Sequence, residues 1–141
     1  MNSVKLTDSL AVSGQITPQD VADIAAAGYK VLINNRPDGE ESAQPSGAAI
    51  AVAARAAGLE YHHMPVTAMS FPGPDFEAMS DLLDDPARPV FAFCRTGTRC
   101  ANLWVAGCDE SVREEAIRIA TARGFDLGMA AKYIAQLAPR D

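Results

Sequence analysis

The chain has 141 residues, of which 48% are hydrophobic and 21% charged, a composition typical of one globular domain. Its net charge of −6 argues against a nucleic-acid binder, which needs a basic face to neutralise phosphates. No apolar run is long enough to span a membrane, and the polar first ten residues contain no signal-peptide core. We therefore expect a cytoplasmic protein whose three cysteines are free thiols.

Apolar runs alternate with helical patterns along the chain. We expect strands at 9–13, 29–34, 59–65 and 89–93, and helices at 18–27, 48–57, 75–84, 100–107, 111–123 and 127–137. Thr17 is expected to cap the first helix, and Ser46 the alanine-rich second helix, which Gly58 ends. Strands separated by helices predict an α/β fold with a mostly parallel central sheet flanked by helices. Residues 1–141 are predicted to form one domain, with 109–141 as its C-terminal helices.

The segment between the last predicted strand and the next helix has the composition of an anion-binding loop. It consists of Cys94, Arg95, Thr96, Gly97, Thr98 and Arg99. Gly97 permits a turn whose backbone N–H groups converge on an anion, and the helix that follows adds its positive end. Arg99 can bind an oxyanion with two parallel hydrogen bonds. The same field is expected to lower the pKa of Cys94 and make it a nucleophilic thiolate. The simpler alternative is a small buried cysteine in an ordinary connection.

Two charged residues outside the loop are candidates for the same site. Asp75 is a candidate general acid, although an acid that stabilises the first turn of a helix is the simpler explanation. Arg36 follows a predicted strand on the same edge as Cys94, and it either binds substrate or fixes its own loop through Asp38 or Glu40.

Metal binding is not expected. His62 and His63 are adjacent in a predicted strand, so their side chains face opposite sides and cannot ligate one metal together. We expect no metal and no cofactor.

Three segments resemble dual-specificity phosphatases: Gly28 to Glu40, Tyr61 to Val66, and Cys94 to Trp104. Those phosphatases have five residues between the Cys and the Arg of the loop, whereas this chain has four, a spacing similar to many rhodanese-type sulfurtransferases. To about residue 106 the chain resembles the bacterial phosphatase-like domain that occurs alone or fused to β-lactamase-like hydrolases acting on persulfides. This resemblance implies the protein-tyrosine-phosphatase fold.

Three positions depart from the phosphatase pattern. The resemblance places Ala68 where a general-acid Asp is usual, Phe93 where a His precedes the Cys, and Cys100 where a hydroxyl residue follows the Arg. An alkoxide leaving group needs a proton donor, whereas a thiolate or sulfite leaves without one. Cys100 is also a candidate redox partner of Cys94.

Three functions are therefore considered, and sulfur transfer through a persulfide on Cys94 is ranked first. A phosphatase with a phosphocysteine intermediate is the alternative, and a non-catalytic module that binds an anionic or phosphorylated partner is the third. The expected partner is a sulfur or phosphate anion, on a small molecule or a protein, together with a persulfide-handling enzyme. No nucleic acid or membrane partner is expected, and the sequence does not define the oligomeric state.

Overall fold

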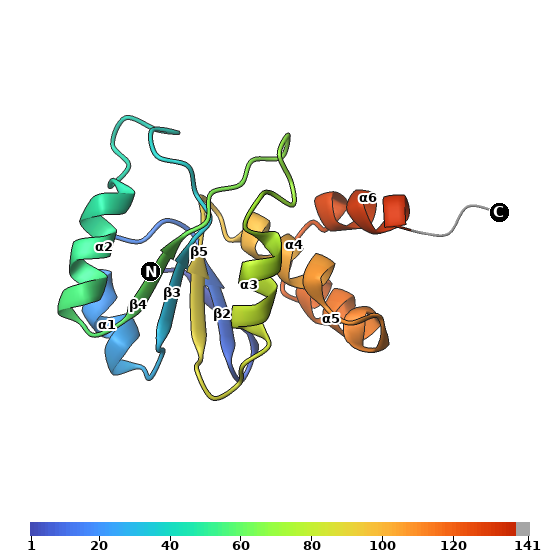
Figure 1. Cartoon of the computed structure of the whole chain (residues 1–141), viewed down its shortest axis with the longest axis horizontal. Coiled ribbons are helices and arrows are strands. Elements are labelled where there is room, and N and C mark those ends of the chain that lie inside the picture. The colour runs from blue at the N-terminus through green and yellow to red at the C-terminus, as the bar shows by residue number, and fades with distance from the viewer. Residues whose placement is uncertain (138–141) are drawn as a thin grey trace.

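The computed structural model describes residues 1–137 as an α/β fold (Figure 1). The strands are β1 (Ser3–Thr7), β2 (Leu10–Ser13), β3 (Val31–Asn34), β4 (Glu60–His63) and β5 (Val90–Phe93). The helices are α1 (Asp20–Ala26), α2 (Gly47–Ala56), α3 (Phe76–Leu83), α4 (Thr98–Gly107), α5 (Glu110–Ala122) and α6 (Gly128–Leu137). Within the described residues, no helix is long and apolar enough to cross a membrane.

The strands form one sheet in the order β1-β2-β5-β3-β4. Strands β2, β5, β3 and β4 are parallel to one another, which confirms the predicted mostly parallel sheet. Strand β1 pairs antiparallel with β2 at one edge, and the sequence did not predict it. It is largely exposed and buries only Leu6, so it lacks the continuous apolar run that marks β3 and β5.

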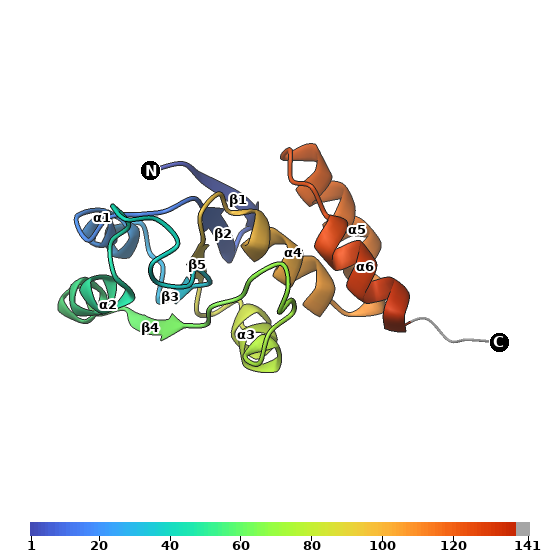
Figure 2. The same cartoon turned by 90° about the horizontal axis from the view of Figure 1, so that it is seen from above.

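Helices cover both faces of the sheet. Helices α1 and α2 lie on one face, and α3 and α4 lie on the other, with α5 and α6 packed outside α4 (Figures 1 and 2). Alternate residues of β5 enter the two cores: Phe91 and Phe93 pack toward α1 and α2, whereas Val90, Ala92 and Cys94 pack toward α3 and α4. The period of two along a strand therefore points the Cys94 side chain to the α4 side.

Two helix starts differ from the sequence prediction by two residues, and the other four by one. Helix α1 begins at Asp20 with Gln19 at its N-cap, so Thr17 does not cap it. Instead the hydrogen bond between these two residues runs from backbone to side chain in the other sense: the Thr17 backbone amide donates to the Asp20 carboxylate at 2.9 Å. Helix α4 begins at Thr98, two residues earlier than predicted. Ser46 does cap α2, accepting a hydrogen bond from the Ala49 amide at 3.1 Å.

The register of the parallel strands brings their carboxyl ends to one edge. Phe93 at the end of β5 is level with Ser13 on β2 and with Asn34 on β3. Cys94 is therefore the first residue beyond the sheet at its centre, which is where ligands bind in open α/β sheets.

Candidate active site

The loop between β5 and α4 is held by the end of β2. The Cys94 amide donates to the Ser13 carbonyl at 3.2 Å, and the Gln15 amide donates to the Arg95 carbonyl at 3.3 Å. Gly97 has φ of 86°, a left-handed conformation that disfavours a side chain. A Cβ atom there would also lie 3.4 Å from the Ser13 carbonyl carbon and from the Phe125 ring. The glycine thus lets the loop turn sharply into the N-terminus of α4.

The sulfur of Cys94 is fully buried at the base of this loop and accepts hydrogen bonds. The Gly97 amide donates to it at 3.1 Å. A hydrogen bond from the Cys100 thiol is the main cause that lowers the pKa of Cys94 to about 5; burial opposes the shift, and the Cys100 and Thr96 amides and the Arg99 charge add to it. The direction agrees with the sequence prediction, but the largest cause differs, because the prediction relied on the arginines and the helix N-terminus.

Cys100 lies in the first turn of α4 and is fully buried. Burial, followed by the hydrogen bond and the negative charge of Cys94, raises its pKa well above the ordinary value. Cys100 is therefore a neutral thiol, and it lowers the pKa of Cys94 in the way a hydrogen-bond donor does. A serine or threonine hydroxyl would serve as the same kind of donor.

Arg99 uses the end of its guanidinium to hold a carboxylate. Its Nη1 and Nη2 atoms each donate to Glu40 at 2.8 Å, and Nη1 also donates to the Val66 carbonyl at 3.0 Å. These bonds use three of the five N–H groups, so within the described residues Nε–H and one Nη2–H remain for an anion. The two parallel hydrogen bonds predicted from Arg99 to an oxyanion must therefore come from Nε–H and Nη2–H, which form the side edge of the guanidinium.

Glu40 was not predicted as a member of the site. Its hydrogen bond from Arg99 is the first cause that lowers the pKa of Glu40 to about 2, opposed by burial and aided by Arg36 and both arginine charges. At neutral pH this carboxylate is ionised. Glu40 and Arg99 are 59 positions apart in sequence, and only the fold brings them together.

Arg36 is buried and fixes the loop that follows β3. Its three nitrogen atoms donate to Glu40 at 2.9 Å, to Glu41 at 2.8 Å and to Gln15 at 2.9 Å. Of the two possibilities considered from sequence, the geometry favours loop fixation, through Glu40 and Glu41. Asp38 instead accepts a hydrogen bond at 2.7 Å from the backbone at the start of α2.

The positive charge of the site is nearly balanced. Arg95 is exposed and pairs with Glu41 at 3.0 Å, so three arginines (Arg36, Arg95 and Arg99) face two glutamates (Glu40 and Glu41). The sum of these charges is +1, and it falls to zero when Cys94 is ionised.

The two threonines of the loop bond to each other. The Thr96 hydroxyl donates to the Thr98 hydroxyl at 3.0 Å, and Thr96 is exposed. Within residues 1–137, no hydrogen bond joins either hydroxyl to the Cys94 sulfur, which accepts from the Gly97 amide.

The structure does not connect Asp75 with the loop. Asp75 is at the N-cap of α3, and its side chain makes no capping hydrogen bond. It lines a cavity of about 10 Å³ together with Asn35, Phe76 and Met79. Among residues 1–137, no hydrogen bond links Asp75 to residues 94–99. Ala68 is exposed on the loop that leads to α3.

The adjacent histidines bind separate partners. His62 Nε2 lies 2.6 Å from the Glu60 carboxylate, and His63 Nε2 lies 2.8 Å from the Arg36 carbonyl. In the described part of the chain, no group of three or more His, Cys, Asp or Glu side chains is arranged to hold a metal ion.

The chain is similar to known proteins of one kind. Residues 3–110 match the family described as "Beta-lactamase hydrolase-like protein, phosphatase-like domain". Beta-lactamase hydrolase-like proteins from Agrobacterium fabrum and Xylella fastidiosa are 34% and 35% identical over 137 residues, which is 95% of this chain. These residues amount to 32% of each relative, so the chain spans about a third of their length.

Solved structures are similar over almost the whole chain. A "putative phosphatase" from Neisseria meningitidis is 38% identical, with a TM-score of 0.76 and coverage of 96% of this chain and 97% of that one. The structure of Tk-PTP in the active form is 15% identical, with a TM-score of 0.71 and coverage of 96% and 95%, and it supports the fold alone. The sequence match, the sheet order and the loop geometry lead to one conclusion: the chain belongs to the phosphatase-like domain family of beta-lactamase hydrolase-like proteins, with a protein-tyrosine-phosphatase-like fold.

Proposed function

We propose that the chain is a cysteine-dependent phosphatase that hydrolyses a phosphate monoester through a phosphocysteine on Cys94. The carrying observation is the position of the Cys94 sulfur, which is buried at the carboxyl edge of the sheet and accepts a hydrogen bond from the Gly97 amide at 3.1 Å. Its surroundings, Cys100 first among them, lower its pKa to about 5. The similarity to a phosphatase-like family and to a structure of nearly equal length supports this choice. The sequence alone had ranked sulfur transfer first, and none of these similarities supports that order.

In the first step the thiolate attacks phosphorus, an S–P bond forms, and the ester P–O bond breaks. The side edge of Arg99 and the loop amides hold the phosphoryl oxygens. In the second step water attacks phosphorus, the S–P bond breaks, and inorganic phosphate leaves. The Cys100 thiol then donates to the departing Cys94 thiolate, which lowers the barrier to its release.

The leaving group limits the choice of substrate. Glu40 has a pKa of about 2 and is ionised at neutral pH, so it cannot supply a proton. Asp75 faces its own small cavity, and Ala68 has no acid to offer. A protein general acid contributes about 10²–10⁴ in rate. We therefore expect good leaving groups, such as aryl oxides, to react far faster than alkoxides.

Sulfur transfer remains the second candidate, because of two specific features. Only four residues separate Cys94 from Arg99, which gives a short loop, and a thiolate or sulfite leaves without a proton donor. In that reaction Cys94 takes the outer sulfur of a persulfide and passes it to a thiol.

One experiment separates these functions. The purified chain is assayed with an aryl and an alkyl phosphate, and its intact mass is measured after incubation with thiosulfate or glutathione persulfide. We expect aryl phosphate hydrolysis that Cys94→Ser abolishes and Cys108→Ser preserves, since half-buried Cys108 has a pKa raised by burial to about 11. A gain of one sulfur on Cys94 without phosphate release would establish the second candidate instead. Anion binding that survives in Cys94→Ser, with no turnover in the unmodified chain, would indicate a binding module.

A further inference from the structure

A cavity of about 190 Å³ lies between the loop that precedes α3 and helix α6. Its wall on the loop side is formed by Ala68, Met69 and Phe71, and its wall on the helix side by Met129, Lys132, Tyr133 and Gln136. Complete ligand pockets are usually about 300–1,000 Å³ in volume, so this cavity is of a size to hold one part of a ligand.

Both walls of the cavity are attached to the catalytic loop. On one side, Arg99 donates to the Val66 carbonyl at 3.0 Å. Ala68, which lines the cavity, is two residues after Val66, so the chain between them spans at most about 7 Å. On the other side, the buried Asn102 amide group donates to the Thr98 carbonyl at 2.9 Å and accepts from the Ala130 amide at 2.9 Å. The N-terminal half of α4, which follows the anion-binding loop, is therefore in contact with the segments that form both walls of the cavity.

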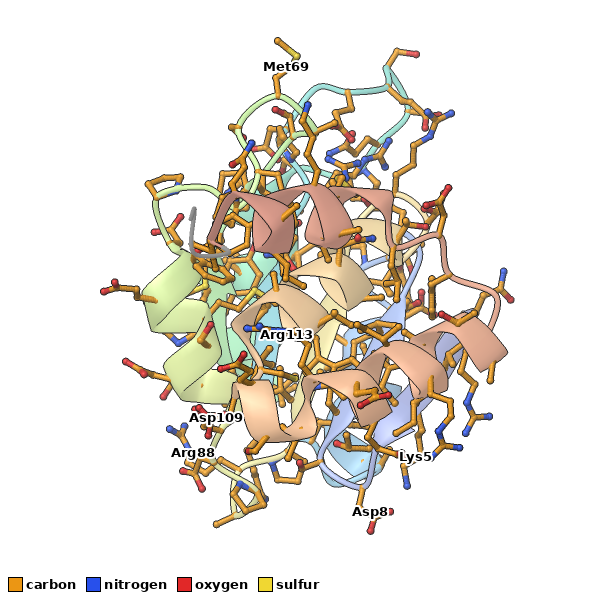
Figure 3. The ribbon with its side chains drawn as sticks, turned by 90° about the vertical axis from the view of Figure 1, so that its right-hand side faces the viewer. Lys5, Asp8, Met69, Arg88, Asp109 and Arg113 are labelled. Atoms are coloured by element: carbon orange, nitrogen blue, oxygen red, sulfur yellow. The ribbon has the colours of Figure 1, made fainter. Side chains whose placement is uncertain are left out.

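The lining combines two aromatic rings with a cation. Phe71 and Tyr133 pack edge to face, with ring centroids 6.3 Å apart. Met69 projects from the tip of its loop, 97% exposed, and has no packing role in the chain itself (Figure 3). Lys132 adds an ammonium group, and no carboxylate of residues 1–137 lies within ion-pairing distance of it.

We propose that this cavity binds the part of the substrate that is not transferred, and that it selects an apolar group ending in an anion that pairs with Lys132. The inference rests on the proposed phosphatase function and names its substrate class: monoesters whose leaving group carries a ring or chain with a distal carboxylate or second phosphate. The apolar part covers Met69 and packs on Phe71 and Tyr133, while the phosphoryl group lies in the loop at Cys94.

The kinetic test compares phenyl phosphate with its analogue that carries a 2-carboxyethyl group at ring position 4, 3-(4-phosphonooxyphenyl)propanoate. We expect the carboxylate to raise kcat/KM about two- to fivefold, mainly through KM, because an exposed ion pair contributes up to about 1 kcal/mol. Lys132→Gln should abolish this preference and leave phenyl phosphate turnover unchanged. Lys30→Gln is the matched control, since it removes the same charge at the opposite edge of the sheet, where the exposed Lys30 precedes β3.

A binding measurement makes the test independent of turnover. The phosphate-free probe 3-phenylpropanoate is titrated into the chain while backbone amide signals are followed by NMR. We expect shifts at Ala68, Phe71, Met129 and Tyr133, and about two- to fivefold weaker binding in Lys132→Gln, which is the energy of one exposed ion pair. Probe binding without any phosphatase turnover would preserve the subsite and overturn the proposed function. Turnover without carboxylate preference, or shifts outside these residues, would overturn the subsite and leave the function standing.

Discussion

The hydrogen bond from Cys100 to Cys94 gives the sharpest prediction, because one sulfur atom can be removed from a buried contact. A hydrogen bond to a charged group contributes about 1.5–3 kcal/mol, and one pKa unit corresponds to about 1.36 kcal/mol. Cys100→Ala should therefore raise the pKa of Cys94 from about 5 by roughly one to two units. Cys100→Ser retains a donor and should shift it much less.

The consequence is largest on the acidic side of neutrality. A nucleophile whose pKa is about 5 is ionised above that pH, so kcat/KM should rise toward pH 5 and then level off. In Cys100→Ala the rising limb should move to higher pH by the same one to two units, roughly. The ultraviolet absorbance of the thiolate, titrated in the Cys108→Ser background, measures the pKa of Cys94 directly. An unchanged pKa in Cys100→Ala would refute the assignment of Cys100 as the main donor, and circular dichroism excludes simple unfolding.

Three other predictions concern the same loop and the residues around it. Mild peroxide should join Cys94 to Cys100 in a disulfide, because the two buried thiols are close enough for each to shift the pKa of the other, and peptide mapping of Cys100→Ser should show sulfinic acid at Cys94 instead. Glu40→Gln should weaken the two-bond hold on Arg99, raise KM for an aryl phosphate and change acid stability. The Glu40 pKa is lowered, so its contribution to stability is complete above about pH 4.5 and is lost as pH falls toward about 2, which acid-unfolding curves of the two proteins measure. Ala68→Asp should speed alkyl phosphate hydrolysis more than aryl hydrolysis; an equal effect on both would place residue 68 away from the leaving group.

The sequence was sufficient to predict those elements of the fold that are marked by a local pattern of residues. Strands β3 and β5 are buried along their whole length, so their continuous apolar runs predicted them, and Ser46 capped α2 as its local geometry requires. Strand β1 was not predicted, because it is an exposed edge strand whose pairing with β2 depends on a partner rather than on its own pattern.

The candidate site likewise has one part that local sequence predicts and another that depends on contacts between distant residues. The order of residues in the loop from Cys94 to Arg99 is local, and the structure places that loop at the carboxyl edge of the sheet. Glu40 and Glu41 lie in a polar loop with no periodicity, and their contact with Arg99 and Arg95 spans more than fifty residues. Long-range ion pairs of this kind leave no signal in a single sequence.

The two glutamates at the loop also determine how a substrate arrives. A site with three arginines alone would attract anions over a long range and bind them more slowly as salt is added. Here the local charge is zero once Cys94 is ionised, and the whole chain carries a net charge of −6. An approaching anion therefore meets overall repulsion, which dissolved salt screens beyond a Debye length of about 10 Å at 0.1 M. Ionic strength should consequently accelerate capture of a doubly charged substrate at low concentration, the opposite of the behaviour of an electrostatically steered enzyme.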